Sequence, residues 1–250
     1  MSLRKRFARQ LSNQRWQTIR KGPLWPLFLY RGQTPFLLYK KGSDPLSSSY
    51  MSNKLTPDFY QREDVVQLSR ELLGKVLCTH IDGLETRAII AETEAYAGVT
   101  DRASHAYGGR RTQRTEPMFA TGGIAYVYLC YGIHHLFNVV TGPADTPHAV
   151  LVRAGKPLQG LETMLQRRDK TALDKTLLAG PGSLARALGI STALSGESLR
   201  SDALWIEDHG IAVDEAAITV GARVGIDYAG DDAALPYRFR VSGSDPFFAV

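Results

Sequence analysis

The chain has 250 residues, which is enough for one large domain or two small ones. A hydrophobic fraction of 44% beside 22% charged residues is typical of a soluble globular protein, and no apolar run approaches the roughly 20 residues that span a bilayer, so no membrane association is expected. The net charge of +5 divides unevenly, because residues 1–50 hold ten Lys or Arg and one acid, and residues 51–250 hold 20 basic and 24 acidic residues. A nucleic-acid surface in residues 51–250 therefore has to come from local clusters of basic side chains, since the balance there is −4.

Residues 1–50 lack the apolar periodicity of a domain, and we expect them to be a disordered basic extension of a domain at 51–250. Their arginines fit an organelle-targeting peptide or an arm that helps to hold DNA. We favour a third reading, in which translation starts at Met51, because the globular pattern begins soon after it. Cys78 and Cys130 lie in apolar sequence and are expected to be reduced core residues, which favours an intracellular protein: cytoplasmic or in the nucleoid of a bacterium, nuclear or organellar in a eukaryote.

The first periodic elements are a helix and a hairpin. Residues 65–73 have apolar side chains at helical spacing, and Gly74 ends this helix. Residues 75–81 predict a strand, Asp82-Gly83 is a strong signal for a hairpin turn, and residues 85–91 predict the returning strand.

Two carboxylates, Glu92 and Glu94, come after this strand two residues apart, and Tyr96 stands at the same spacing beyond them. Residues two apart in an extended segment point to one face, so the three side chains share a side if the strand continues. A carboxylate beside apolar sequence can have a raised pKa and act as a general acid or base. A Glu-X-Glu pair alone is more often a solvated strand end, so the pair gains weight only from the other motifs further along the chain.

Residues 97–118 read as a loop that contains His105 and a cluster of arginines. Arg110, Arg111 and Arg114 come soon after a Gly-Gly pair. Glycine lets a backbone approach closely and arginine binds phosphate with two hydrogen bonds, so the segment fits contacts to a DNA backbone. Taken alone, three arginines in a loop indicate only a solvated surface.

Residues 124–140 are β-rich and read as a hairpin with Tyr131-Gly132 at its turn. Alternation places Tyr126, Tyr128 and Cys130 on one face. An aromatic residue at a hairpin apex is either a wedge for a base stack or folded back onto its own sheet, and the spacing leaves both readings open.

The second half of the chain alternates short elements with glycine-rich turns, without an internal repeat, a P-loop or a dinucleotide signature. His134 and His135 lack metal-ligand spacing and are read as strand residues. A buried strand at 149–152 ends in Arg153, which is either a surface residue or the partner of a buried acid. The remaining predicted elements are helices at 160–168 and 184–188 and strands at 204–207, 222–224 and 237–241.

Several short motifs stand in a characteristic order along the chain. They are Glu92-Thr-Glu-Ala-Tyr96, Ser104-His105, Gly108-Gly-Arg110, Met118-Phe119, Tyr126-Val-Tyr128, Tyr131-Gly132, Asn138, Leu151-Val-Arg-Ala154, Ala179-Gly-Pro181 and Arg223-Val-Gly-Ile226. Together they resemble the alkyladenine DNA glycosylases, the mammalian type of 3-methyladenine DNA glycosylase. The resemblance covers the chain from about residue 60 to its end, and the order of the motifs is more specific than any one of them.

The resemblance implies an enzyme that flips alkylated purines out of duplex DNA and hydrolyses the N-glycosidic bond without cutting the strand. Glu94 then matches the general base that deprotonates the attacking water, and Arg153 matches its partner, while Glu92 is structural. The implied substrates are 3-methyladenine most readily, and 7-methylguanine and hypoxanthine in addition. The implied partner is double-stranded DNA with damaged bases, and we expect a monomer with no metal and no cofactor.

The resemblance also assigns the residues that would hold the base. Tyr96, His105 and Tyr128 match an aromatic pocket around the flipped purine, and Asn138 matches the residue that helps to reject guanine. Tyr131 matches the tyrosine that fills the gap in the minor groove. The expected fold is α+β: a single compact domain with a curved, mostly antiparallel sheet, surrounding helices and a protruding β-hairpin.

Three other functions compete with this one. A metal-dependent nuclease would use Glu92 and Glu94 as ligands and needs a third carboxylate. A non-catalytic minor-groove binder would need only the Tyr131 wedge. A glycosylase that also cuts the strand needs an amine nucleophile, and the chain has no lysine between Lys75 and Lys156, which argues against it.

Overall fold

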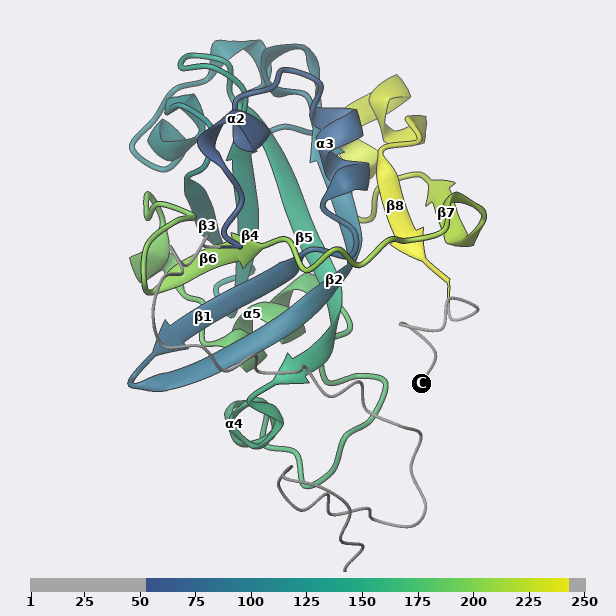
Figure 1. Ribbon diagram of the computed structural model, residues 1–250. Helices are drawn as coiled ribbons and strands as arrows, with labels where there is room; N and C mark the ends of the chain where they lie inside the picture. The colour runs from purple at the N-terminus through teal and green to yellow at the C-terminus, as the bar shows by residue number, and fades with distance from the viewer. Residues whose placement is uncertain (1–52, 243–250) are drawn as a thin grey trace, which may run out of the picture. The chain divides into compact units, whose positions relative to one another are not determined.

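An antiparallel sheet organises the part of the chain that the computed structural model describes, residues 53–242 (Figure 1). Its strands are β1 (Val76–Ile81), β2 (Leu84–Tyr96), β3 (Ala125–Cys130), β4 (His134–Thr141), β5 (His148–Gln159), β6 (Leu204–Glu207), β7 (Ile218–Gly221) and β8 (Arg238–Val241). Within the described residues the strand order is β3-β4-β5-β2-β1-β6, while β8 pairs with β2 and with β7. The expectations for residues 1–50 lie outside the described residues.

Strand β2 bends and so serves two neighbours along one edge. It pairs with β1 along its first half and with β8 along Glu92–Glu94, while β5 lies along its other edge. The pairing with β5 shifts register between Ile90 and Thr93, and a β-bulge of this kind bends a strand and re-aims its side chains. The bend therefore falls at the two carboxylates.

Two hairpin turns use residues in the left-handed region. Asp82 and Gly83 have φ of 56° and 73° and join β1 to β2, as predicted. Tyr131 and Gly132, with φ of 51° and 73°, join β3 to β4. An Asp-Gly pair suits such a turn, whereas a bulky L residue in this region costs about 1–2 kcal/mol. Local preference therefore does not explain the tyrosine in the second hairpin.

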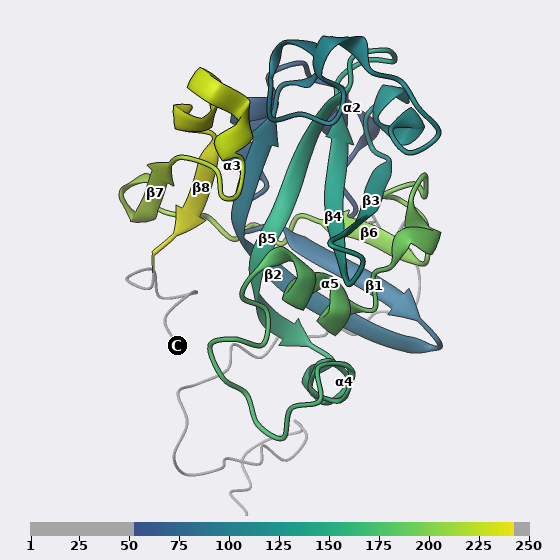
Figure 2. The same ribbon diagram turned by 180° about the vertical axis from the view of Figure 1, so that it is seen from behind.

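Helices and short turns cover the sheet (Figure 2). The helices are α2 (Pro57–Tyr60), α3 (Val65–Glu71), α4 (Leu161–Arg167) and α5 (Pro181–Leu188). Asp64 caps α3, because its side chain accepts a hydrogen bond from Gln67 N at 2.9 Å. Helix α3 packs on β2, and α5 packs on β4, β5 and α4. The predicted loop at 97–118 contains short 3₁₀ turns, at 98–100, 107–109 and 116–119.

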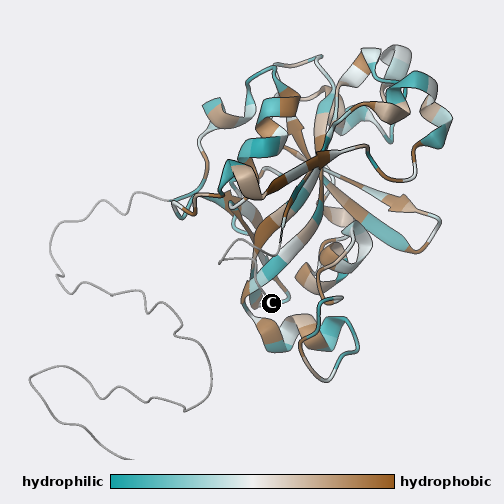
Figure 3. Ribbon diagram, turned by 90° about the vertical axis from the view of Figure 1, so that its right-hand side faces the viewer, coloured by the Kyte–Doolittle hydropathy of each residue, from teal (hydrophilic) through white to brown (hydrophobic). Residues whose placement is uncertain are grey.

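The core lies where the sheet meets these helices. Leu77, Phe137, Val150 and Leu188 are fully buried there, and removal of their apolar surface from water is the main force that holds the elements together. Figure 3 shows brown, hydrophobic residues where the strands meet at the centre, and brown and teal residues alternating on the helices around them.

The predicted fold class is confirmed: the described residues form one α+β unit with a curved antiparallel sheet, covering helices and the β3–β4 hairpin. Two predicted elements need correction. Residues 222–224 are not a strand, because β7 ends at Gly221 and the Arg223 side chain is drawn inside by Asp101. Helix α5 begins at Pro181 rather than at Leu184, since proline is favourable in the first turn of a helix.

No helix in residues 53–242 has both the length and the apolar character that a membrane span requires. Cys78 and Cys130 are both free thiols. Cys78 is buried as expected, whereas Cys130 is only partly buried, because it lies near the tip of the hairpin.

Candidate active site

A cavity of about 690 Å³ opens over the ends of β2 and β3 and the first halves of β4 and β5. Pockets that hold a small organic molecule usually have volumes of about 300–1,000 Å³, so a purine base fits this space. Most of the site residues predicted from the sequence line it: Tyr96, His105, Arg114, Tyr128, Tyr131, Asn138 and Arg153. The structure therefore brings together residues that are far apart in the chain.

Glu94 does not itself line this cavity, but the residues that hold its carboxylate do. Its carboxylate is fully buried and accepts hydrogen bonds from the Tyr96 hydroxyl at 2.9 Å and from Arg153 Nη1 at 3.2 Å, both on Oε2. The backbone N–H of Val224 donates to Oε1 at 2.9 Å. Tyr96, Arg153 and Val224, which all line the cavity, therefore place the carboxylate next to it.

Burial has the largest influence on the charge of Glu94 and raises the pKa of its carboxyl. The Arg153 charge, the Val224 amide and the Tyr96 hydroxyl act in the opposite direction, because each stabilises the ionised form, but they do not offset the burial. A carboxylate with a raised pKa is a stronger base than an exposed one.

Glu92 holds Arg153 in place. Its Oε1 accepts hydrogen bonds from Arg153 Nε at 3.0 Å and from Arg238 Nε at 2.7 Å. Arg153 is thus shared between Glu92 and Glu94, which resolves the choice left open by the sequence: it is the partner of buried acids. Arg153 contacts both Glu92 and Glu94, and the Tyr96 hydroxyl contacts Glu94, so the three predicted side chains lie on one side of β2, as expected.

An aromatic wall forms one side of the cavity. The ring of His105 meets the ring of Tyr128 edge to face, with centroids 4.6 Å apart, and its Nδ1 lies 2.8 Å from the Tyr126 hydroxyl. Burial and, to a lesser degree, the charges of nearby arginines lower the pKa of His105 to about 4. The imidazole is therefore neutral near pH 7, and Tyr126 joins the predicted pocket residues as a buried support.

Asn138 is fixed within the wall of the cavity. It is buried, and its Nδ2 donates a hydrogen bond to the backbone oxygen of Tyr126 at 3.0 Å. Because one end of the amide is tied to β3, the side chain cannot turn freely to follow different bases. It can therefore act as a fixed polar group in a mostly aromatic pocket.

Tyr131 projects from the tip of the β3–β4 hairpin. Tyr131 is 91% exposed, so its side chain protrudes and is not folded back onto its own sheet. Ile133 beside it is 71% exposed. Exposed apolar side chains on a strained turn gain nothing from the fold itself, and such features commonly mark a binding surface.

The three predicted arginines differ in their surroundings. Arg111 is bound to Glu116 and to Asp145, at 2.6 Å and 2.7 Å, which neutralises its charge locally. Arg114 lies over the Tyr128 ring, 5.0 Å from its centroid. Arg110 is exposed, lines a second cavity of about 370 Å³ beside the first, and makes no ion pair within the described part of the chain.

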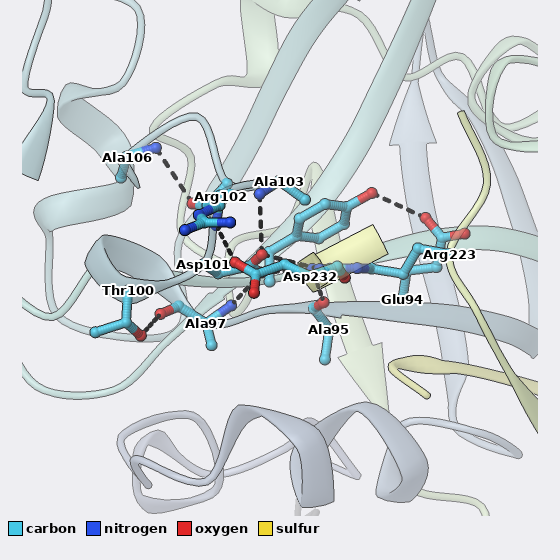
Figure 4. A network of polar contacts seen from close by, with 12 residues as sticks. Glu94, Ala95, Ala97, Thr100, Asp101, Arg102, Ala103, Ala106, Arg223 and Asp232 are labelled. Carbon is cyan, nitrogen blue, oxygen red and sulfur yellow. Dashed lines mark hydrogen bonds and ion pairs between the residues drawn. The ribbon is translucent and has the colours of Figure 1, made fainter. Parts of the chain in front are cut away.

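Sequence reasoning missed the role of the segment at 223–224. Arg223 pairs with the buried Asp101 (Figure 4), and the next residue, Val224, donates its backbone N–H to Glu94. The Arg-Val-Gly-Ile motif was the available signal, but a backbone donor has no residue type that would reveal it. Within residues 53–242 no three His, Cys, Asp or Glu side chains gather closely enough to hold a metal ion.

Comparison with known proteins places the chain in one family. The family model for methylpurine-DNA glycosylases matches residues 58–245. A Chlamydia pneumoniae protein named "Putative 3-methyladenine DNA glycosylase" is 48% identical over 192 residues, which cover 76% of this chain and 96% of that protein. A protein of the same name from Bacillus cereus is 46% identical over 195 residues, which cover 75% of this chain and 95% of that protein. These matches confirm the resemblance seen in the motifs, and the chain belongs to the methylpurine-DNA glycosylase family, as a hydrolase that acts on DNA.

Proposed function

We propose that this enzyme removes alkylated purines from double-stranded DNA by hydrolysis of the N-glycosidic bond, with 3-methyladenine as its best substrate and 7-methylguanine and hypoxanthine as further ones. The observation that carries this proposal is the position of Glu94, a buried carboxylate held by three residues that line a cavity of purine size. A carboxylate in that position can take a proton from a water at the cavity floor. The names of the relatives support the choice of substrate.

The aromatic wall accounts for the preference for alkylated purines. A base inside a duplex cannot reach the cavity, so the damaged nucleotide has to turn out of the helix. Tyr96 and Tyr128 provide aromatic rings in the cavity, and an electron-rich ring face attracts a cationic purine more than a neutral one. His105 does not repel such a cation, because its pKa of about 4 keeps it neutral.

The chemical step follows from the donors around Glu94. Water attacks C1′ of the sugar, the electron pair of the N-glycosidic bond leaves with the purine, and positive charge builds on the sugar. Glu94 takes the proton of this water, and its negative charge stabilises the sugar cation. Oε1 accepts one hydrogen bond from Val224, which leaves it a second lone pair for the water.

The charge of the purine determines whether it needs a proton in order to leave. A purine that carries a positive charge from alkylation leaves as a neutral molecule once the bond electrons move to it. Hypoxanthine has to gain a proton as it leaves, which makes it the slower substrate. Arg153, held by Glu92, positions the water and stabilises the ionised form of Glu94.

The hairpin and the arginines hold the DNA around the extruded nucleotide. The Tyr131 ring, exposed at the tip, fills the gap that the flipped nucleotide leaves in the stack. Arg110 and Arg114, beside the cavities, bind backbone phosphates, and Arg111 does so more weakly because it is already paired. One chain supplies every group of the site, so the enzyme acts as a monomer.

We propose that the reaction ends at the abasic site. Cleavage of the strand by a glycosylase needs an amine nucleophile, and among the described residues no lysine lines the cavity. The sequence also has none between Lys75 and Lys156.

One experiment separates this function from its alternatives. Duplex DNA methylated with dimethyl sulfate is incubated with the wild type, with Glu94→Gln and with Glu207→Gln, with and without EDTA, and the released bases are identified by chromatography. Glu207 is the matched control, because it is a largely buried acid that pairs with an arginine, Arg87. It lies on β6, at the other end of the strand order from the β3–β4 hairpin.

We expect release of 3-methyladenine that EDTA does not affect, and loss of about 10²–10⁴-fold in rate for Glu94→Gln. The Glu94→Gln protein should still bind a duplex with an abasic analogue, and Glu207→Gln should behave as the wild type. Equal rates for Glu94→Gln and the wild type would contradict the proposal. Inhibition by EDTA would favour a nuclease, and strand nicking without added base would favour a lyase.

A further inference from the structure

A buried ion pair outside the cavity lining joins the segments that carry the active site. The side chains of Asp101 and Arg223 are 1% and 0% exposed. Arg223 Nη2 binds Asp101 Oδ1 at 2.8 Å, and Nη1 binds Oδ2, so the two charges meet through a double contact. Figure 4 shows this pair in one network with Glu94.

Arg223 also binds the end of β2. Its Nη1 donates to the backbone oxygen of Ala95 at 2.8 Å, the residue between Glu94 and Tyr96. Its Cζ lies 4.7 Å from the centroid of the Tyr96 ring, so the guanidinium supports that ring as well. A third contact, from Nη2 to the backbone oxygen of Asp232 at 3.2 Å, ties the same side chain to the segment after Val224.

Asp101 fixes the start of the loop that carries His105. Its Oδ2 accepts a hydrogen bond from Ala97 N at 2.9 Å, and its Oδ1 accepts one from Ala103 N at 3.0 Å. The carboxylate therefore holds the backbone on both sides of itself while it holds Arg223.

The residue after Arg223 is Val224, whose backbone N–H donates a hydrogen bond to Glu94. Val224 N is the next backbone N–H after Arg223, and it donates to Glu94 Oε1 at 2.9 Å. A fixed Arg223 side chain thus fixes the direction of that hydrogen bond. Any shift of the pair would move the carboxylate, the Tyr96 ring and the Val224 amide relative to one another.

We propose that the Asp101–Arg223 pair positions the active site, by aligning Glu94, Tyr96 and the Val224 amide for the activation of water without touching the DNA. The inference rests on the proposed role of Glu94 as general base. Stability alone does not account for the pair, because burial of charges is costly and Arg223 Nε is buried with no hydrogen-bond partner among the described residues.

The pair leaves a signature in the pH dependence. The groups that face Glu94 from the surrounding elements are Tyr96 of β2, Arg153 of β5, Arg238 of β8, the Val224 amide and Arg223. The Val224 amide stabilises the ionised carboxylate and so lowers its pKa. If that amide is displaced, the pKa of Glu94 rises, and the loss of activity on the acid side moves to higher pH.

Two conservative variants disturb the pair without removing a whole partner. Arg223→Lys keeps the charge, but a single ammonium group cannot bind both Asp101 oxygens and the Ala95 oxygen in the same geometry. Asp101→Asn keeps the shape but replaces one acceptor oxygen by a donor. The matched control is Arg167→Lys, because Arg167 also holds backbone oxygens, those of Ile81 and Ala187, but lies outside the site.

The experiment measures three quantities for folded protein: thermal stability, affinity for a duplex with an abasic analogue, and the single-turnover rate of base release against pH. For Arg223→Lys and Asp101→Asn we expect unchanged affinity for this duplex and a rate of base release lower by about 10²-fold. We also expect the fall of that rate towards low pH, the acid limb of the profile, to lie at higher pH than in the wild type. Arg167→Lys should keep the wild-type rate and limb even if its stability falls.

A folded Arg223→Lys or Asp101→Asn protein with the wild-type rate and limb would overturn the inference. A loss of rate that follows a loss of affinity, with the limb unmoved, would overturn it as well, because the pair would then be merely structural. Glu94→Gln in parallel separates this failure from that of the proposed function: if Glu94→Gln keeps base release, the proposed function fails, and if it is inactive, only the inference is at stake.

Discussion

At the scale of single residues, the proposed role of Glu94 as general base depends on how burial affects its ionisation. Only the ionised carboxylate can take a proton from water, and burial disfavours that form. The surrounding donors limit this penalty, since Arg153, the Val224 amide and Tyr96 each contact the carboxylate. The result is a base that is stronger than an exposed glutamate but loses its charge more easily as the pH falls.

The first prediction is a pH dependence of base release with its acid limb above the ordinary glutamate pKa of about 4.3. Because the pKa of Glu94 is raised, its protonation and the loss of activity begin at higher pH than for an exposed glutamate. The measurement is the single-turnover release of 3-methyladenine from methylated duplex DNA against pH, after subtraction of the release without enzyme.

His105→Gln is the control for this assignment. Burial lowers the pKa of His105 to about 4 and raises the pKa of Glu94, so the two groups shift in opposite directions. An acid limb above the ordinary glutamate value is therefore assigned to Glu94, and His105→Gln should leave it at the same pH. A limb that disappears in His105→Gln, or one that lies at or below the ordinary glutamate value in the wild type, would show that another group controls the rate.

At the scale of elements, the β3–β4 hairpin shows a conflict between stability and function. Tyr131 adopts a φ of 51° and exposes 91% of its surface, and both features are unfavourable for a large aromatic residue in an isolated protein. The β1–β2 hairpin has the same kind of turn with Asp82 at the equivalent position, at φ of 56°, where the residue type fits the backbone. The difference is what the proposed contact of Tyr131 with DNA accounts for.

The second prediction is that Tyr131→Asn stabilises the protein and weakens its binding to DNA. Asparagine tolerates the left-handed region better than tyrosine, so the free energy of unfolding should rise by about 0.5–1 kcal/mol. Affinity for a duplex with an abasic analogue should fall, because the ring that fills the gap is lost. Thermal unfolding and equilibrium binding measure the two effects.

Asp82→Asn provides the matched control, because it makes the corresponding change in the other hairpin and should alter neither quantity by much. If Tyr131→Asn retained wild-type affinity, the wedge assignment would be wrong. If it were strongly destabilised, the tyrosine would be part of the fold after all.

Some of these features can be predicted from the sequence and others cannot, for a physical reason. The β1–β2 hairpin could be predicted because Asp82-Gly83 and the apolar strands around it are local signals. The pocket residues Tyr96, His105 and Tyr128 followed only from the resemblance to a family, since no spacing rule joins them. The Asp101–Arg223 pair spans 122 residues of the chain, and the mistaken strand at 222–224 arose because that long-range contact overrides local β preference.

At the scale of the whole molecule, attraction to DNA has to arise from the distribution of charge. Residues 51–250 have a balance of −4, so a uniform surface would repel a polyanion. Beside the cavities, however, Arg110 and Arg114 face no acidic partner among the described residues, whereas Arg111 is bound to Glu116 and Asp145. The three arginines cannot be told apart by their positions in the sequence, whereas their partners in the structure differ.

The third prediction uses this difference between neighbours. Arg110→Ala should weaken binding to undamaged duplex DNA and reduce the slope of log Kd against log salt by about 1, because one phosphate contact is lost. Arg111→Ala should have a smaller effect on both, since its guanidinium is already neutralised by two carboxylates and has to leave them before it can meet a phosphate.

Titration of a labelled duplex at several salt concentrations measures both slopes, with Arg111→Ala as the control for the loss of a positive charge from the same loop. The two substitutions change the net charge of the molecule equally, so a field that acts at long range would make their effects equal. Equal losses of slope would therefore contradict a local phosphate contact at Arg110. A loss confined to Arg110→Ala would mean that the acids at 116 and 145 decide which arginine of this loop binds the DNA backbone.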